Sequence, residues 1–473
     1  MILMWPMVPL SKMKTTYIVL PKIFYLLIIG LVSSCQSFVE VDLPKSQLTT
    51  ESVFEDYNTT EAALTNIYTS IREKGILTGG QLGISNQLGN YADEITCVDN
   101  PSKASYNFYR NSLLPTNTYV TGYWNAAYNQ IYAANLVIQG TKSSKNLTAQ
   151  QKDQLEGEAL FIRALLHFYL TNIFGDIPYA TQTDYKQNSI ISKTSVDQVY
   201  RLVVTDLQDA SVLLSSKDDN PGRLQPSVSA AQALLSRVYL YLKAYPEASN
   251  SASAVLNQSS EYKLENISNV FLISSSETIW QLQSELTGQN TADGAFFIFT
   301  SVPPPSVSLD SQLIASFNAA DLRKTNWIKS VTKGSQTYFH SYKYKEKDFT
   351  ATSKEYAIVL RLAEQYLIRA EARAYQGDLI GAKEDLNKIR NRAGLNNVAA
   401  VTHQEILDAI HLERRWELFT EYGHRFFDLK RSGKLDSSLN GIKPGWNSSD
   451  ALFPLPQNEL TANPNLRPQN TGY

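Results

Sequence analysis

The sequence predicts a mostly α-helical protein in which helices pack in pairs beside an inserted region of loops and short β-strands. Two observations support this fold class. Apolar residues recur at the helical spacing of three to four positions over long stretches in both halves of the 473-residue chain. Between these stretches, at about 259–354, the spacing changes to the two-residue period of strands. A chain of this length can bury one large core or two smaller ones.

The first 34 residues have the pattern of a secretory signal peptide. Lysines precede an apolar run, Ile23–Val32, which is shorter than the roughly 20 residues that cross a bilayer. Two serines and Cys35 follow this run. Cysteines in this position are acylated in bacterial lipoproteins, so we expect a lipid anchor at Cys35, with ordinary signal cleavage as the alternative. Met13 is an alternative start, and residues 35–58 are expected to form an extended tether.

Residues that disfavour helix mark the limits of the predicted elements. Gly175-Asp-Ile-Pro178 ends a long helix, and residues 75–118 and 441–473 predict irregular structure because they are rich in glycine, asparagine or proline. Within 259–354, a buried strand is predicted at Ala295–Phe299 and another at Tyr338–Tyr344. The predicted helices cover about 60–74, 119–139, 148–174, 195–214, 356–375, 379–392, 403–422 and 425–431.

Two helix pairs share one pattern of small residues and a turn after a tyrosine. Ser236, Tyr239 and Ala248 of the first pair match Ala370, Arg373 and Ala382 of the second. This pattern is similar to the tetratricopeptide repeat, whose period is about 34 residues. The matched positions lie much farther apart, so an insertion at about 259–354 separates repeats at about 119–258 and 355–432. We expect a left-handed cap at Gly377 and a close helix contact at Ala382.

Glu413, Glu417 and Glu421 recur at a four-residue spacing and therefore share one helix face. Paired carboxylates could serve the acid–base chemistry of a glycosidase. Three neighbouring negative charges, however, are more stable beside arginines than beside a substrate. Arginines lie close by in the sequence at Arg414, Arg415 and Arg425. We interpret the cluster as an ion-pair network that holds the last helices against the core.

Other patterns of catalysis or metal binding are absent from the sequence. There is no Gly-x-Ser-x-Gly elbow, no phosphate-binding glycine loop, and no His-Glu-x-x-His motif. His167 lies in an apolar helical stripe, which predicts a hydrogen-bonded core residue rather than a ligand. A formal net charge of −2 provides no basic surface for nucleic acid. We expect no catalytic site, no metal site and no cofactor.

Longer motifs occur in a fixed order along nearly the whole chain. The first is the cysteine motif at Cys35. The others are the segments 124–135 (WNAAYNQIYAAN), 156–169 (EGEALFIRALLHFY), 174–178 (FGDIP), 413–425 (ERRWELFTEYGHR), 427–431 (FDLKR), 452–456 (LFPLP), 463–466 (NPNL) and 469–473 (QNTGY). Together these motifs resemble those of the SusD/RagB family of outer-membrane nutrient-binding lipoproteins. The resemblance implies one domain over 59–473, with tetratricopeptide-like helices supporting a ligand-binding surface.

The resemblance also implies a location and a partner. A protein of this family is expected on the exterior of the outer membrane, where it passes a nutrient, here a glycan, to a TonB-dependent channel of the SusC type. Three alternatives stay open: a binder of peptides or another non-sugar nutrient, a surface glycoside hydrolase, and a scaffold that binds protein partners.

Aromatic residues in the loops and the insertion are candidates for stacking on sugar rings, although core packing is the alternative for each of them. Trp327 stands among polar neighbours, so we expect an exposed stacking platform there. Asp93 could bond sugar hydroxyls. The full set of candidates is Tyr91, Asp93, Tyr106, Tyr109, Trp280, Trp327, Tyr338 and Tyr342.

Overall fold

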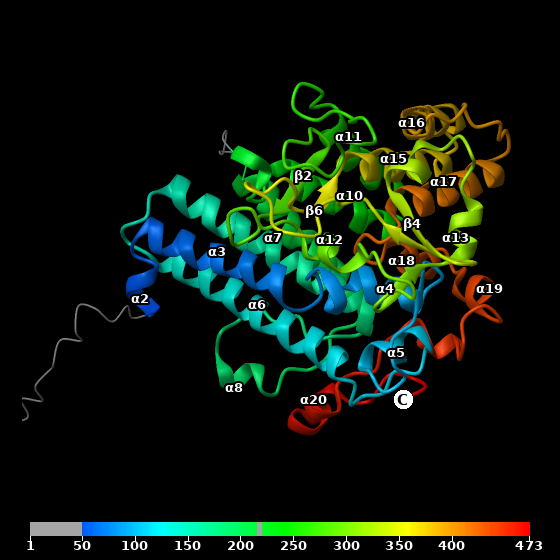
Figure 1. The fold of residues 1–473 in the computed structure, drawn as a ribbon. Coiled ribbons are helices and arrows are strands. Elements are labelled where there is room, and N and C mark those ends of the chain that lie inside the picture. Colours follow the sequence, from blue (N-terminus) through cyan, green and yellow to red (C-terminus); the bar gives the residue numbers. More distant parts are fainter. Residues whose placement is uncertain (1–49, 215–219) are drawn as a thin grey trace, which may run out of the picture. The chain divides into compact units, whose positions relative to one another are not determined.

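The computed structural model describes residues 50–214 and 220–473 (Figure 1). Residues 51–473 form one compact unit. The predicted signal peptide, Cys35 and most of the predicted tether lie outside the described residues and stay predictions. Among the described residues, no helix combines the length and apolar character needed to span a membrane.

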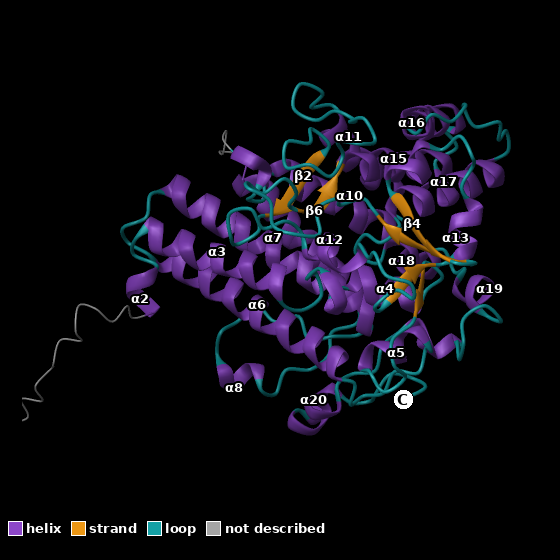
Figure 2. Ribbon diagram, viewed as in Figure 1, coloured by secondary structure: helices purple, strands orange, loops and turns teal. Residues whose placement is uncertain are grey.

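Most of the described chain is helical (Figure 2). The longer helices are α3 (Tyr57–Glu73), α6 (Thr118–Ser143), α7 (Ala149–Phe174), α9 (Val196–Leu213), α10 (Val228–Tyr241), α11 (Tyr245–Leu256), α15 (Leu362–Tyr375), α16 (Leu379–Arg392) and α17 (His403–Leu418). The shorter ones are α2 (Thr50–Val53), α4 (Ile84–Tyr91), α5 (Ala104–Tyr109), α8 (Tyr185–Asn188), α12 (Ala292–Phe297), α13 (Ser311–Ser316), α14 (Leu322–Asn326), α18 (His424–Arg431), α19 (Leu435–Leu439) and α20 (Gln457–Ala462). Single 3₁₀ turns are η1 (Gly80–Leu82), η3 (Pro221–Arg223), η4 (Ser448–Ala451) and η5 (Pro464–Leu466).

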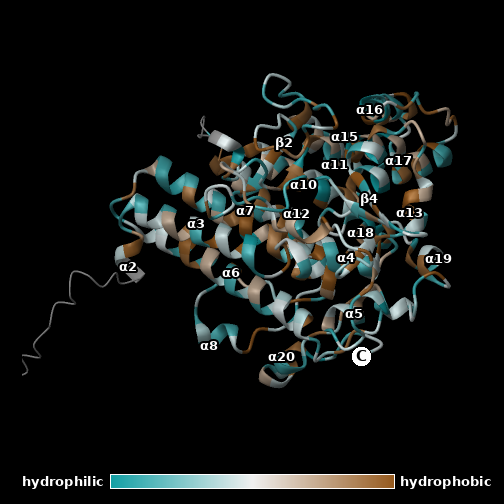
Figure 3. Cartoon of the chain, in the orientation of Figure 1, coloured by the Kyte–Doolittle hydropathy of each residue, from teal (hydrophilic) through white to brown (hydrophobic). Residues whose placement is uncertain are grey.

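The helices form where apolar periodicity and capping agree. Thr148 caps α7 through a reciprocal capping box with Gln151, and Gly175 ends the helix at φ +78°. From Gly157 onward, every residue of α7 is buried, because the helix packs against both α6 and α9. In contrast, α3 carries hydrophobic and hydrophilic turns side by side (Figure 3) and buries one stripe of residues. That stripe is Thr60, Leu64, Ile67 and Ile71.

The two predicted repeat units pack on each other, with α11 and α10 against α15. The hydroxyl of Ser236 donates to Oε1 of Gln365 at 2.7 Å across this contact. Ala248 and Ala382 are fully buried, as expected for close helix approaches. Gly377 follows α15 with φ +86°, which confirms the predicted left-handed cap. The mostly helical, tetratricopeptide-like fold class is confirmed.

Three antiparallel strand pairs occur among the described residues. They are β1 (Ile95–Cys97) with β3 (Val307–Leu309), β2 (Thr278–Leu282) with β6 (Ala357–Arg361), and β4 (Ile328–Lys333) with β5 (Gln336–Ser341). In the last pair, Ile328 faces Ser341 and Lys333 faces Gln336 across a tight hairpin. The predicted strand at Tyr338–Tyr344 is therefore confirmed in part, since β5 ends at Ser341.

Three of the sequence-based element predictions are wrong. Ala295–Phe299 was expected as a strand, but α12 covers most of it, because the Thr291 hydroxyl accepts from the Gly294 amide and caps a helix. The glycine-rich segment 75–118 contains α4, β1 and α5 rather than loops alone. The helix expected from residue 356 begins at Leu362, because the preceding residues pair with β2 as β6.

Candidate functional site

Three of the aromatic candidates are buried. Trp327 is fully covered, and its indole N–H donates to the Ile267 carbonyl at 2.8 Å. Trp280 is equally buried and donates to the Leu224 carbonyl at 3.2 Å. Tyr91 lies among other buried rings, with its ring centre 5.0 Å from that of Phe453. The expectation that these rings stack on a ligand is corrected here, because no part of them reaches solvent.

The carboxylate of Asp93 is buried and paired with arginines. Its two carboxylate oxygens accept from Arg425 at 2.7 and 2.8 Å, and Arg415 adds a contact at 2.9 Å. Although burial alone would raise its pKa, the hydrogen bonds and charges of these two guanidiniums lower the pKa of Asp93 below its usual value. Asp93 therefore links the segment after α4 to α17 and α18, and the expectation that it bonds sugar hydroxyls is corrected.

The other four candidates, Tyr106, Tyr109, Tyr338 and Tyr342, stay half-exposed, and we call the surface that they define the loop face. They stand on neighbouring elements, because α5 packs on β1, β1 pairs with β3, and β3 packs on β5.

Within the loop face, the rings of Tyr106 and Tyr109 lie 5.9 Å apart, tilted by 51°. The ammonium of Lys443 lies 4.1 Å from the Tyr109 ring centre, and that of Lys329 lies 4.9 Å from the Tyr342 ring centre. Two of the four rings thus each lie beside a lysine ammonium.

The predicted carboxylate cluster is an ion-pair network, as expected, although its partners differ from those predicted. Glu413, Glu417 and Glu421 are buried and contact cations from the insertion, from β6 and from α16. These cations are Arg323, Lys343, Arg361, Arg390 and Arg392. Arg414, Arg415 and Arg425 pair with Asp428 and Asp93 instead.

Such a network leaves no carboxylate of the cluster for catalysis. Glu417, in particular, contacts three guanidiniums at 2.5–3.0 Å. Burial alone would raise its pKa, but the charges of Arg392, Arg361 and Arg323 hold the pKa of Glu417 far below its usual value. A permanently ionised, fully paired carboxylate cannot deliver a proton to a glycosidic oxygen.

His167 is a core residue, as predicted. Its Nδ1 lies 2.9 Å from the Arg163 carbonyl, its Nε2 accepts from the Ala180 amide at 3.1 Å, and its ring stacks on Tyr179. Burial lowers the pKa of His167 to about 3, so the ring is neutral. In the described part of the chain, no three metal-ligating side chains come together in a way that could hold an ion.

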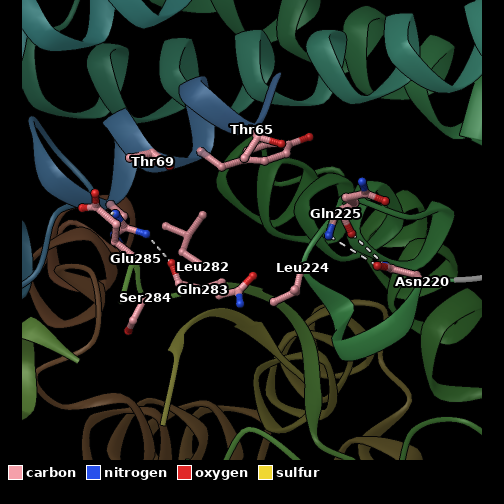
Figure 4. Close-up of a pocket in the computed structure, with 11 residues that line it drawn as sticks. Thr65, Thr69, Asn220, Leu224, Gln225, Leu282, Gln283, Ser284 and Glu285 are labelled. Atoms are coloured by element: carbon pink, nitrogen blue, oxygen red, sulfur yellow. Dashed lines mark hydrogen bonds and ion pairs between the residues drawn. The ribbon is translucent and has the colours of Figure 1, made fainter. Parts of the chain in front are cut away.

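Of the cavities on the helical part of the described chain, two are large enough for a small ligand. The smaller, about 410 Å³, lies between α3, the end of β2 and residues 220–225 (Figure 4). Its lining is mixed: Thr65 and Thr69 contribute hydroxyls, while Arg72 and Glu285 form an ion pair at 3.6 Å. Tyr68 turns its hydroxyl away to Glu158 at 2.5 Å. This cavity offers hydroxyl and amide groups and the half-buried ring of Tyr68.

The larger cavity, about 610 Å³, is a groove along α6 that the sequence analysis missed. We call it the α6 groove; α8 and α20 lie beside it (Figure 1). Its lining residues are Trp124, Asn125, Tyr128, Asn129, Tyr132, Asn135, Pro178, Ala180, Gln182, Tyr185, Asn188, Ser189, Ile191, Glu459, Ala462, Asn463 and Leu466. A signal was present in the sequence, because Asn125, Tyr128, Asn129 and Tyr132 recur at helical spacing and place rings and amides on one face.

Two family models match the chain. One, described as starch-binding and associating with the outer membrane, covers residues 37–240, and the model of the SusD family covers residues 312–473. The chain belongs to the SusD/RagB family. Members of this family are binding proteins rather than enzymes.

Three SusD-like proteins of Formosa agariphila match along almost their whole length. SusD-like protein P2 of Formosa agariphila is 28% identical over 98% of this chain and 100% of its own. A SusD superfamily protein from Bacteroides vulgatus has the same fold, with a TM-score of 0.77 and 23% identity over 89% of this chain and 100% of that one. A laminarin-binding SusD-like protein gives a TM-score of 0.74 at 23% identity, covering 88% and 99% of the two chains.

Proposed function

We propose that this SusD-like protein is a lipid-anchored receptor on the cell surface that binds a glycan at the loop face and delivers it to a SusC-like TonB-dependent channel. The observation that carries the proposal is the tyrosine pair Tyr106 and Tyr109, half-exposed beside Lys443 in a chain of a starch-binding family. Rings that reach the surface suit the flat C–H faces of sugars, and here the short helix α5 holds two of them on a helical scaffold.

Family membership supports the proposed channel partner, and the cysteine motif at Cys35 supports the proposed membrane anchor. The matching family model is described as associating with the outer membrane, which supports this location. A related fold binds laminarin, so β-glucans and starch-type α-glucans are the first ligands to test.

A titration of the purified protein with laminarihexaose and maltoheptaose tests the proposal. We expect Tyr106→Ala and Tyr109→Ala each to weaken binding about tenfold, the usual range for an aromatic anchor, with unchanged melting temperatures. Tyr375→Ala is the matched control, since Tyr375 is an exposed tyrosine on α15, 40% exposed. Equal affinity in wild type and both loop-face variants would remove the loop face from the proposal. Selective binding of short peptides instead of glycans would show that the ligand is a peptide.

A further inference from the structure

We propose that the α6 groove is a second carbohydrate site, distinct from the loop face, and that it accepts neutral oligosaccharides. Its volume, about 610 Å³, falls within the range of roughly 300–1,000 Å³ that small-ligand sites occupy. The inference does not depend on what the loop face binds.

Hydrogen bonds within the protein hold the walls of the α6 groove in place. On one side, the Tyr128 hydroxyl donates to the Pro178 carbonyl at 2.8 Å, and the Asn135 amide donates to the Ala180 carbonyl at 2.9 Å. On the other side, the Asn463 amide donates to the Ile191 carbonyl at 2.8 Å. These bonds fix the loop between α7 and α9 against α6 and against the C-terminal segment. A preformed wall lowers the entropic cost of ordering loops around a ligand.

Polar groups in the groove are left for a ligand. Within the described residues, the side-chain amides of Asn125, Asn129 and Gln182 make no hydrogen bond with the protein, and neither do the hydroxyls of Tyr132 and Tyr185. An amide offers donors and an acceptor together, which is the combination that a sugar hydroxyl needs. Several such groups around one concave space match a ligand with many hydroxyls.

Aromatic faces accompany these amides. Tyr132 and Tyr185 both line the groove. Their rings are open to solvent, since Tyr132 is 44% exposed and Tyr185 is 80% exposed. Trp124 and Tyr128 also line the groove, with ring centres 4.8 Å apart. Exposed rings beside unpaired amides provide stacking and hydrogen bonding for the same ligand.

The charge of the lining selects neutral sugars. The seventeen lining residues include no lysine, arginine or histidine, and their one ionisable carboxylate is that of Glu459. An anionic sugar in the groove would lose hydration without gaining a cation and would face a like charge. The loop face differs, because Lys329 and Lys443 lie against its tyrosines. A protein partner is a poorer fit, since protein interfaces are flatter and pair their polar groups directly.

The test is hydrogen–deuterium exchange of the full chain with maltoheptaose, laminarihexaose or cellohexaose at millimolar concentration, and with trigalacturonate as the anionic probe. We expect a neutral sugar to protect the segments 118–135 and 178–191, and trigalacturonate to leave them unchanged. Tyr132→Ala and Asn129→Ala should each raise, at least tenfold, the sugar concentration that is needed for half of the full protection. Tyr375→Ala is the control, with 40% exposure against 44% for Tyr132.

The variant Tyr109→Ala separates this proposal from that for the loop face. If the groove is a site of its own, Tyr109→Ala keeps protection of 178–191. If Tyr109→Ala binds glycan at the loop face as tightly as wild type while the groove stays protected, the loop-face proposal alone is refuted. The groove proposal is overturned if none of the neutral sugars protects 178–191, if Tyr132→Ala behaves as wild type, or if protection requires an added channel protein.

Discussion

At the scale of single residues, sequence context alone misjudged exposure. Trp327 is flanked by polar residues, which suggested a surface ring, yet α14 and β4 send those neighbours outward and fold the indole inward. There its ring packs edge-on against Phe271, with centres 5.5 Å apart. A tryptophan has one polar atom, and the Ile267 carbonyl satisfies it. No short-range pattern reveals which distant carbonyl plays this part.

We therefore predict that Trp327→Ala destabilises the protein by about 3–5 kcal/mol, because it removes a fully buried ring and leaves a cavity. Chemical denaturation followed by circular dichroism measures the change. Tyr185→Ala, at 80% exposure, is the control and should change stability by less than about 0.5 kcal/mol. A wild-type midpoint for Trp327→Ala would mean that the indole is not buried in solution.

Glu94 gives a prediction of pH dependence. Burial, followed by the charge of Asp93, raises the pKa of Glu94 to about 7, while its Oε2 accepts from the Thr420 amide at 3.3 Å. In this range the folded state binds a proton that the unfolded state has released, so this residue lowers stability as the pH rises from about 4.5 to about 7. The effect of one such group is at most roughly 3 kcal/mol.

Glu94→Gln removes this ionisation and keeps an oxygen for the Thr420 amide. Relative to wild type, the variant should gain stability between pH 5 and 7 and show a constant difference above pH 7. Denaturation midpoints at a series of pH values test this. Parallel profiles for the two proteins across that range would contradict the raised pKa of Glu94.

At the scale of elements, periodicity and capping predicted the long helices well, and pairing with distant segments explains the failures. The residues of α7, α9 and α16 carry their own start and stop signals, so their limits could be predicted. β6 could not, because residues 357–361 become a strand through hydrogen bonds to β2, some eighty positions earlier. For the same reason, the cations that surround Glu417 were missed, since they are distant in sequence.

Ala382 tests the packing of one element pair. It is fully buried where α16 meets α15, beside Leu367 and Leu386. Ala382→Leu should overpack this contact and cost about 1–3 kcal/mol, measured as a lower denaturation midpoint. Ile380 lies two positions away on the same helix and is 72% exposed, so Ile380→Ala should have little effect. Similar midpoints for both variants would show that α16 does not approach α15 as closely as described.

At the scale of the whole molecule, family motifs spread along the chain predicted the fold that the structure has. They did not predict where a ligand lies, because the four loop-face tyrosines and the α6 groove depend on how separate segments meet. Half of the candidate residues lie in the interior. The groove was not predicted, although residues 124–135 of α6 are one of the family motifs. Composition could not separate these cases, because tyrosine serves both in cores and on binding surfaces.

The anchor is also a property of the whole molecule. If Cys35 carries lipid, Cys35→Ala should release the protein from the membrane fraction while the glycan affinity of the purified protein stays unchanged. Labelling with a radioactive fatty acid measures lipidation, and cell fractionation measures retention in the membrane. Equal membrane retention of wild type and variant would disprove the anchor without affecting either binding site.

Phe453 links the two ends of the folded unit. It is buried beside Tyr91, Phe108 and Phe174, which all come from the first half of the unit, and its amide donates to the Ile173 carbonyl at 2.9 Å. The segment that closes this core is thus synthesised after everything it covers. During synthesis, the earlier helices keep an open apolar seam until that segment arrives. The fold can therefore close only after the chain has been made past residue 453, so a fragment that ends earlier would leave this apolar core open.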